Sequence, residues 1–470
     1  MNLSEIKHIY LLGIGGIGMS AIARYFNAQG KKVSGYDKTS TPLTDKLISE
    51  GIQIHFEDDI NFFKLRTPIP DPVGDELRTI LVIYTPAIPK DHSEFNYFNK
   101  NGFTLKKRSE VLGMITKESF TIAIAGTHGK TTTSALITYI LKHSGIDCTA
   151  FVGGIMSNYN TNIIIAGSTE NRKPKTENFF VVEADEYDRS FLTLHPDIAV
   201  ITSMDADHLD IYDEKKNLEE SFNLFAKQVK ENGILIHKKN LPVEKIQREV
   251  LTYSINGKAD FTAKNIFIRN GNFVFDTGKI KNITLGIPGK HNIENSLAAI
   301  AVAQKLGISE KKIKNALQTF KGVKRRFEYI IKTDKIVFID DYAHHPEELK
   351  ACISAVKEIY PKKKITGVFQ PHLFTRTRDF ANEFARSLDL LDEVILLPVY
   401  PARELPIEGV NSEMLLKKSS TKNKILCQKS ELVTEILKRN VEVLITLGAG
   451  DIDALVRPIS EALQKEHNLK

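Results

Sequence analysis

Cysteine is scarce in this sequence, and the three cysteines that it has follow no regular pattern. Cys148, Cys352 and Cys427 lie far apart, are odd in number and form no Cys-x-x-Cys pair. Disulfide frameworks and zinc knuckles both depend on regular cysteine spacing, so neither is indicated. The apolar content of 42% is ordinary for a globular protein and lets each domain bury its own core.

Long apolar runs and clusters of basic residues are also missing. No run approaches the ~20 residues of a membrane-spanning helix, and the first apolar segment, 9–14, leads straight into glycines, unlike a secretory signal. The formal net charge of +6 is dispersed, and short basic runs such as 362–364 lack interleaved aromatics. We therefore expect a cytoplasmic enzyme, monomeric or homodimeric, that binds small anionic substrates and neither nucleic acid nor a membrane.

The most informative stretch is 125–133 (AGTHGKTTT), which lies between an apolar run at 120–125 and a helix-like run. Strand, glycine loop and helix in this order form a phosphate cradle, because glycines let backbone N–H groups turn toward an anion. Lys130 can reach terminal phosphates, and the Thr131 hydroxyl can ligate Mg²⁺. The loop is shorter than G-x-x-x-x-G-K-[ST], since its first glycine is Gly126.

A second glycine motif lies near the N-terminus. Residues 13–18 (GIGGIG) follow a buried-strand pattern at 9–12 and open a helix at 19–28, so G-x-G-x-x-G stands in strand–turn–helix context. The next strand, 32–36, ends on Asp37, and an acidic residue there can bind a ribose hydroxyl. The motif predicts a nucleotide diphosphate site and leaves the nucleotide open.

Polar residues follow other apolar strands of the first two thirds of the chain. Strand 79–84 leads to a rigid loop that begins at Thr85, and the run 179–182 leads to Glu183 in EADE. Ligands collect at such strand ends in open α/β sheets. In a phosphate-loop sheet the acidic residue holds Mg²⁺ directly or through water, which makes Glu183 a predicted ligand. His208, after a later strand, is left open, because histidine is a poor magnesium ligand.

The segment after residue 259 has a different pattern of apolar residues. Short apolar strands at 266–268 and 273–275 flank an Asn-Gly pair, which predicts a small antiparallel appendage on the central domain. A helix follows at 293–306. From that helix alone, Asn292 and Asn295 either cap it or hydrogen-bond a base.

The last third of the chain returns to strand–helix alternation. Its predicted strands, at 336–339, 365–369, 394–398 and 443–447, each lead to a polar cluster, at 340–346, 370–376, 400–403 and 448–451 respectively. Four such clusters at corresponding ends predict a ligand-facing rim.

These patterns predict an α/β protein of three domains, within the two to four that 470 residues suggest. Residues 1–117 form an N-terminal Rossmann-like domain. Residues 118–323 form a central P-loop ATPase-type domain that carries the antiparallel appendage, and residues 324–470 form a C-terminal Rossmann-like domain.

In this order the motifs closely resemble the Mur ligases of peptidoglycan synthesis. The resemblance covers essentially the whole chain and rests on 126–133, EADE at 183–186, Asp207-His208, His291-Asn292 with Asn295, RRFE at 325–328 and DYAHHP at 341–346. It implies a first domain for a UDP-sugar, a second for ATP and a third for an amino acid. ATP would phosphorylate the lactyl carboxylate of UDP-N-acetylmuramate, and an amine would then attack the acyl phosphate.

Within the family, the pattern is similar to the members that add L-alanine. The nearest alternative is a recycling ligase that attaches an intact tripeptide to the same UDP-sugar. Such members carry a cysteine in the first glycine loop, and 13–18 has none. This difference favours L-alanine.

The resemblance also implies roles for single residues. Lys130 contacts the β and γ phosphates, Thr131 and Glu183 hold Mg²⁺ (or Mn²⁺), and His208 places a second metal. Lys130, Glu183, His208, His344 and Arg376 form the catalytic set. The ATP site comprises Gly126, Thr127, His128, Gly129, Lys130, Thr131, Thr132, Asn292, Asn295, Arg326 and Asp341. The UDP-sugar site comprises Gly13, Gly15, Gly16, Gly18, Asp37 and Thr85. The amino-acid pocket comprises Tyr342, His344, Arg376 and Arg378, with the division of carboxylate binding between the two arginines open.

Overall fold

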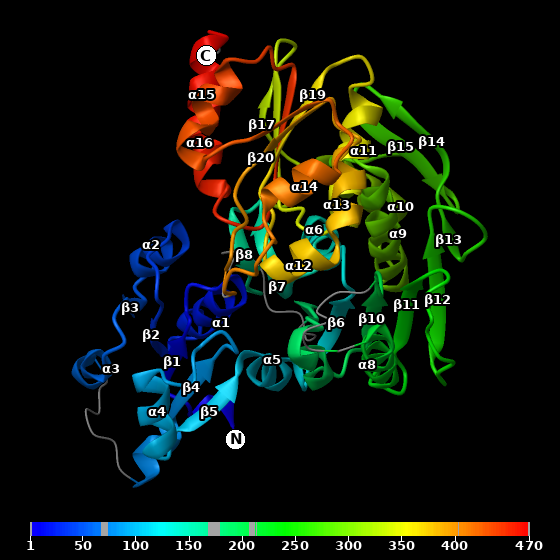
Figure 1. The fold of residues 1–470 in the computed structure, drawn as a ribbon. Helices are drawn as coiled ribbons and strands as arrows, with labels where there is room; N and C mark the ends of the chain where they lie inside the picture. Colours follow the sequence, from blue (N-terminus) through cyan, green and yellow to red (C-terminus); the bar gives the residue numbers. More distant parts are fainter. Residues whose placement is uncertain are drawn as a thin grey trace. The chain divides into compact units, whose positions relative to one another are not determined.

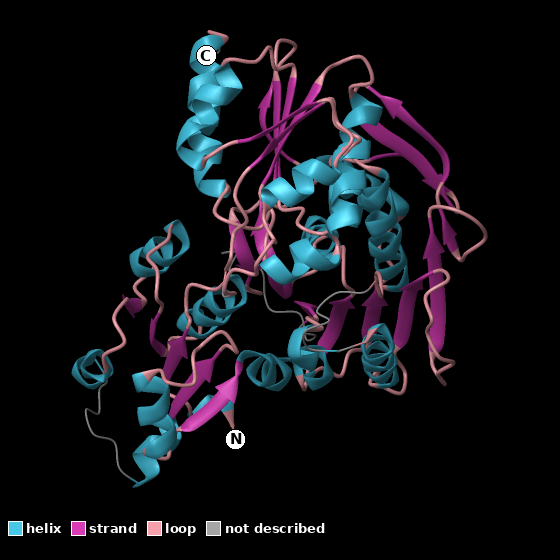
Figure 2. Ribbon diagram, viewed as in Figure 1, coloured by secondary structure: helices cyan, strands magenta, loops and turns pink. Residues whose placement is uncertain are grey.

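The computed structural model in Figure 1 describes residues 2–66, 74–167, 179–205, 212, 214–402 and 404–468. In this described part, the strands form four sheets, three of them predominantly parallel and covered by helices, and one antiparallel (Figure 2). The architecture is therefore α/β, as the sequence predicts. None of the described helices combines the length and apolarity that crossing a membrane requires.

The first sheet is parallel throughout, with the order β3-β2-β1-β4-β5. Its central strand is buried at every position, which explains the unbroken apolar pattern of that segment. The chain order reverses beside this strand, and ligands bind at such a switch point. The strands are β1 (His8–Leu12), β2 (Lys32–Tyr36), β3 (Gln53–His55), β4 (Ile80–Tyr84) and β5 (Thr104–Lys107). The helices are η1 (Leu3–Glu5), α1 (Ile17–Ala28), α2 (Pro42–Ser49), α3 (Ile60–Arg66), η2 (Gly74–Thr79), α4 (Ser93–Lys100) and α5 (Arg108–Thr116).

The second sheet has the order β13-β12-β11-β10-β6-β9-β7-β8, in which β8 alone runs antiparallel to its neighbour. Because β6 lies between β9 and β10, the carboxyl ends of these three strands meet. The strands are β6 (Phe120–Ala125), β7 (Cys148–Met156), β8 (Thr161–Ile164), β9 (Phe179–Glu183), β10 (Ile198–Ile201), β11 (Ile234–Lys238), β12 (Glu249–Ser254) and β13 (Phe261–Thr262). The helices are α6 (Lys130–His143), η3 (Tyr187–Thr193), α8 (Lys215–Lys227), α9 (Lys290–Lys305) and α10 (Glu310–Thr319).

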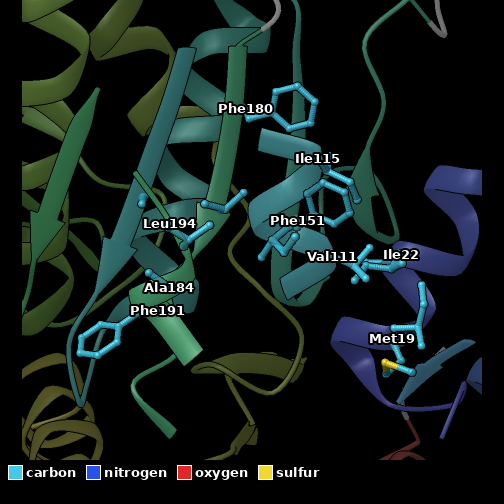
Figure 3. Packing of buried hydrophobic residues seen from close by; sticks show 14 of the residues in the cluster. Met19, Ile22, Val111, Ile115, Phe151, Phe180, Ala184, Phe191 and Leu194 are labelled. Carbon is cyan, nitrogen blue, oxygen red and sulfur yellow. The ribbon is translucent and has the colours of Figure 1, made fainter. Parts of the chain in front are cut away.

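One hydrophobic cluster joins the first two sheets. α1 packs on β7 and β8, and α5 packs on η3. Figure 3 shows part of this cluster, with Met19 and Ile22 from α1, and Val111 and Ile115 from α5. Phe151 and Phe180 come from the second sheet, Phe191 comes from η3, and Leu194 directly follows η3. The segments Met1–Thr262 and Asn295–Ala316 accordingly form one compact unit. The core is thus continuous across residues 117 and 118, where the sequence predicts a domain boundary.

A second compact unit comprises Ala263–Glu294 and Leu317–Lys470. It contains the antiparallel sheet β14 (Lys264–Arg269), β15 (Asn272–Thr277) and β16 (Ile280–Thr284), whose first turn has the positive φ angles at Asn270 (52°) and Gly271 (73°) that an Asn-Gly hairpin predicts.

The same unit contains a six-stranded sheet with the order β17-β18-β22-β19-β20-β21, in which only β17 runs antiparallel. A hydrophobic cluster covers each face. The strands are β17 (Glu328–Lys332), β18 (Val337–Asp341), β19 (Ile365–Phe369), β20 (Glu393–Leu396), β21 (Asn423–Leu426) and β22 (Val443–Leu447). The helices are α11 (Pro346–Ile359), α12 (Phe374–Asp379), α13 (Ala381–Leu388), α14 (Ser412–Lys418), η4 (Lys429–Glu431), α15 (Leu432–Leu437) and α16 (Asp453–Glu466).

Candidate functional site

The phosphate loop connects β6 to α6 and is fitted tightly to the end of β10. A Cβ at Gly126, where φ is 137°, would lie 2.0 Å from Thr202 Oγ1, so only glycine is accommodated. The His128 N–H donates to Ser203 Oγ over 2.7 Å, and the Thr127 hydroxyl lies 2.9 Å from the same oxygen. Gly129 (φ 83°) then caps α6, whose first turn contains Thr132. The loop therefore holds the α6 N-terminus in a fixed orientation toward an anion.

Lys130 is fixed at the base of this loop by a buried carboxylate. Its Nζ donates to Gly126 O (2.6 Å) and to both side-chain oxygens of Glu186 (2.9 and 2.8 Å). The Glu186 side chain is 1% exposed. Burial alone would favour the neutral amine, but the carboxylates of Glu186, Asp185 and Glu183 raise the pKa of Lys130 above its usual value. Lys130 is therefore a permanently charged, positioned cation.

Two oxygen donors suited to a divalent cation lie beside the lysine. Thr131 Oγ1 donates to Glu183 Oε1 over 3.0 Å, and the Gly153 N–H donates to Glu183 Oε2 over 2.8 Å. No cluster of three or more His, Cys, Asp or Glu able to hold a metal occurs among the described residues. Mg²⁺ usually takes only one or two protein oxygens and completes its shell with water and substrate phosphates, so this pair fits Mg²⁺.

Some predicted residues cannot be placed. His208, with its neighbour Asp207, and Arg403 of the C-terminal rim lie outside the described residues. The second metal position that the resemblance implies for His208 therefore stays a prediction.

The two asparagines of α9 differ in their surroundings. Asn295 lies against the phosphate loop, because a Cβ at Gly129 would come within 2.7 Å of Asn295 Oδ1. The Asn292 side chain is buried and donates from Nδ2 to Pro288 O over 2.6 Å. Asn292 thus stabilises the turn that enters the helix, and Asn295 lies next to the loop that holds Lys130.

The N-terminal glycine turn is closed by Asp37 and Thr85. Gly13 has a φ of 86°, and a Cβ there would lie 2.6 Å from Thr85 Cγ2. The Gly15 N–H donates to Asp37 Oδ2 over 2.8 Å. The strand ends of β2 and β4 therefore converge on the turn after β1, as the motif predicts.

The remaining glycines of this motif lie at the start of α1. Gly16 is its N-cap, and Gly18 lies in its first turn. A Cβ at Gly18 would lie 2.7 Å from Arg108 Nη1. The guanidinium of Arg108 thus lies against the first turn of α1, the helix that follows the predicted diphosphate cradle.

In the C-terminal unit, Asp341 and Tyr342 follow β18. The Asp341 carboxylate accepts the Phe327 N–H (2.7 Å) and the Ala343 N–H (2.8 Å). Burial raises the pKa of Asp341 to about 6, although Arg326 opposes this shift. The Tyr342 ring has the guanidinium carbons of Arg325 and Arg326 each 5.1 Å from its centroid. Cation–π contact therefore orders both arginines at this strand end.

His344 and Arg376 form the predicted amino-acid rim. Burial lowers the pKa of His344 to about 4, and the nearby Arg376 charge contributes to the shift. His344 Nδ1 lies 3.0 Å from Tyr342 O and 3.3 Å from Glu348 Oε2. Arg376 is only 8% exposed, whereas the Arg378 side chain is 54% exposed and pairs with Asp379 over 2.7 Å. The structure thus separates the two arginines into one buried and one solvent-facing residue.

Sequence reasoning missed three charged residues of these sites. In the sequence, Glu186 stands out only as part of EADE, and Arg108 and Glu348 belong to no predicted motif. Each acts through a partner distant in sequence: Glu186 on Lys130, Arg108 on Asp185, and Glu348 on Arg326, whose Nη1 lies 3.7 Å from it. A basic residue at the start of a helix after an edge strand was the only signal for Arg108.

Three family models match successive parts of the chain. They are described as the Mur ligase family, catalytic domain (residues 8–120), the Mur ligase middle domain (124–303) and the Mur ligase, glutamate ligase domain (325–453). Together they cover most of the sequence in the order that the motifs predict.

Curated relatives match over nearly full length. The chain is 50% identical over 469 residues to UDP-N-acetylmuramate–L-alanine ligase of Flavobacterium johnsoniae, covering 99% of this chain and 100% of the relative. It is 51% identical over 470 residues to the enzyme of the same name from Flavobacterium psychrophilum, with the same coverage.

Solved structures of Mur ligases also resemble this chain, at lower sequence identity. The UDP-N-acetylmuramate-alanine ligase of Thermotoga maritima superposes with a TM-score of 0.80 at 27% identity, covering 98% of this chain and 99% of that one. A murein peptide ligase from Psychrobacter arcticus has a TM-score of 0.68 at 22% identity, covering 97% and 98%, and so shares the fold.

Proposed function

Because this chain belongs to the Mur ligase family, we infer that it catalyses the ATP-dependent ligation of L-alanine to the lactyl carboxylate of UDP-N-acetylmuramate in peptidoglycan precursor synthesis. The observation that carries this inference is the identity of about half of all residues, over 99% of the chain, to enzymes named for this reaction. The tripeptide-attaching alternative is supported by likenesses of fold at 22% and 23% identity. L-alanine is therefore the substrate that we propose.

Phosphoryl transfer to a carboxylate needs charge neutralisation and positioning more than covalent help. The N–H groups at the α6 N-terminus and the ammonium of Lys130 would neutralise the charge of the β and γ phosphates and hold them in position. Glu186 keeps the ammonium charged and oriented before ATP arrives. Asn295, which lies against the same loop, would contact the nucleotide.

Thr131 and Glu183 would hold Mg²⁺, with Mn²⁺ as a substitute of similar ligand preference. When bound, the cation neutralises phosphate charge as the acyl phosphate forms. Glu183 is held ready by the Gly153 N–H, which fixes one of its oxygens and leaves the other beside the Thr131 hydroxyl.

The other two substrates would bind at the other two sets of strand ends. The glycine turn after β1, with Asp37 and Thr85, would receive the UDP-sugar. Arg376 would pair with the carboxylate of L-alanine, since a guanidinium matches a carboxylate bidentately. His344 is neutral at pH 7, and its Nδ1–H can donate to Tyr342 O, which leaves Nε2 to accept a hydrogen bond from the incoming amine.

The domain limits, the site roles and a cytoplasmic location remain predictions. ATP dependence is a property of the family to which the chain belongs, whereas the cation is our proposal.

One assay tests the proposal. The protein is incubated with ATP, UDP-N-acetylmuramate carrying ¹⁸O in its lactyl carboxylate, and either L-alanine or the tripeptide. We expect phosphate release and amide product with L-alanine, and ¹⁸O in the released phosphate, because an acyl phosphate transfers that oxygen. Release only with the tripeptide would overturn the substrate assignment, and unlabelled phosphate would overturn the acyl-phosphate route.

A further inference from the structure

Arg108 lies between the two predicted phosphate cradles. It is the first residue of α5, immediately after β5. On one side its guanidinium covers the first turn of α1, since a Cβ at Gly18 would lie 2.7 Å from Nη1 and 3.2 Å from Cδ. A larger residue at this position would displace the guanidinium from the first turn of α1.

On its other side, Arg108 reaches the loop that positions Lys130. Its Nη2 donates to Asp185 Oδ2 over 3.2 Å. Asp185 precedes Glu186, the partner of Lys130, and follows Glu183, the proposed metal ligand, by two positions. One guanidinium thus bridges the first turn of α1 and the acidic loop after β9.

Arg108 is distinguished from its two basic neighbours. Lys106 pairs with Glu110 (2.8 Å), and Lys107 pairs with Asp188 (2.7 Å). Arg108 is the one whose guanidinium lies next to Gly18 in the first turn of α1. It holds Asp185 through a single N–H, at the long end of the usual range, and its side chain is 24% exposed. Within the described chain, it therefore keeps further N–H donors for an anion.

The glycine turn itself needs such a cation. The Gly15 N–H is already taken by the carboxylate of Asp37, which adds a negative charge beside the cradle. A bound diphosphate would add at least two more negative charges. The partial charge at the α1 N-terminus offsets only part of this repulsion. A guanidinium, which binds phosphate oxygens bidentately, supplies the missing positive charge.

We propose that Arg108 binds the diphosphate of the UDP-sugar, and that Asp185 holds it over the cradle until the substrate arrives. This assignment rests on the proposed function for the identity of the substrate. It places a substrate-bound cation next to the loop that orients Lys130 and Glu183, so the UDP-sugar and ATP sites share one charged network.

Calorimetric titration of the full-length protein with UDP, uridine and a non-hydrolysable ATP analogue tests the proposal. We expect Arg108→Ala to weaken UDP binding at least about tenfold. Binding of uridine and of the ATP analogue should change less than about twofold, because uridine has no phosphate and Arg108 reaches the ATP-side loop only through its 3.2 Å contact with Asp185. Arg108→Lys should fall between, since a lysine keeps the charge without the fork. Lys106→Ala removes the same charge from the same strand end and should leave UDP binding unchanged.

If the Arg108–Asp185 pair served only to stabilise the fold, the variants would behave differently. Asp185→Asn breaks the pair and retains the arginine, so equal losses of UDP affinity in Asp185→Asn and Arg108→Ala would overturn the proposal. UDP affinity of Arg108→Ala equal to wild type would also overturn it. Should Arg108→Ala fail to fold, Arg108→Lys and Arg108→Gln decide by the same comparison. Wild-type protein that binds UDP but ligates no substrate would refute the proposed function and leave the assignment of Arg108 to be judged on UDP binding.

Discussion

Replacing Lys130 by alanine should cost stability as well as activity. The Lys130 ammonium faces both oxygens of Glu186, at 2.9 and 2.8 Å, and the Glu186 side chain is 1% exposed. From the sequence alone, a loop lysine carries little core packing, so its removal should leave the fold intact. The structure changes that expectation, because the substitution removes the cation that faces a buried carboxylate.

The expected loss of unfolding free energy follows from the burial of the Lys130–Glu186 ion pair. Removing one partner of a buried ion pair costs about 3–5 kcal/mol. At roughly 2 °C per kcal/mol for a large unit, the Tm should fall by about 6–10 °C. Glu186 would also bind a proton more tightly in the folded variant than in the unfolded chain. The unfolded chain then holds fewer protons above the ordinary glutamate pKa, so the loss of stability grows as the pH rises above that value.

Thermal unfolding of Lys130→Ala, Glu186→Gln and the double variant measures this effect. The double variant should regain most of the lost Tm, because no buried carboxylate is left, while ligation remains abolished in both variants that lack the lysine. A Tm for Lys130→Ala within about 2 °C of wild type, or a double variant no more stable than Lys130→Ala, would refute the reasoning.

Three further predictions concern the amino-acid rim and the metal. Arg376→Ala should raise the KM for L-alanine by about 10–100-fold, whereas the exposed Arg378→Ala should change it less than about twofold; equal effects in initial-rate assays would contradict the division. Because burial lowers the pKa of His344 to about 4, the unfolded chain binds more protons between about 4 and 6.5. Unfolding free energy measured in urea should therefore rise across this interval and rise less in His344→Gln; identical profiles would argue against a buried neutral ring. Glu183→Gln should weaken Mn²⁺ binding in the presence of ATP, followed by electron paramagnetic resonance, by at least about tenfold, and unchanged binding would remove Glu183 from the cation site.

Local chemistry made much of the fold predictable. The Asn-Gly hairpin before β15 and the glycine loop before α6 each follow from conformational demands of a few adjacent residues. The strand ends that carry Asp37, Glu183 and Asp341 were predictable for the same reason, because apolar runs that stop at polar residues mark the edges of buried sheets.

Side-chain contacts between residues far apart in the sequence were not predictable. Lys130 and Glu186 are 56 positions apart, and Arg108 and Asp185 are 77 apart. Their contact depends on the register of β6 with β9 and on how α5 packs against η3. In the turn after Glu186, two non-glycine residues, Asp188 and Arg189, have positive φ angles (52° and 53°). No turn motif in the sequence predicts this conformation.

The continuous core beneath the first two sheets limits how this enzyme can be recombined. Residues 1–117 resemble an exchangeable module, yet the apolar faces of α1 and α5 are buried against β7 and η3. A chimaera that took this segment from another enzyme would have to import matching side chains opposite Met19 and Val111. Exchange of this segment alone would otherwise leave apolar side chains of α1 and α5 packed against side chains that do not match them.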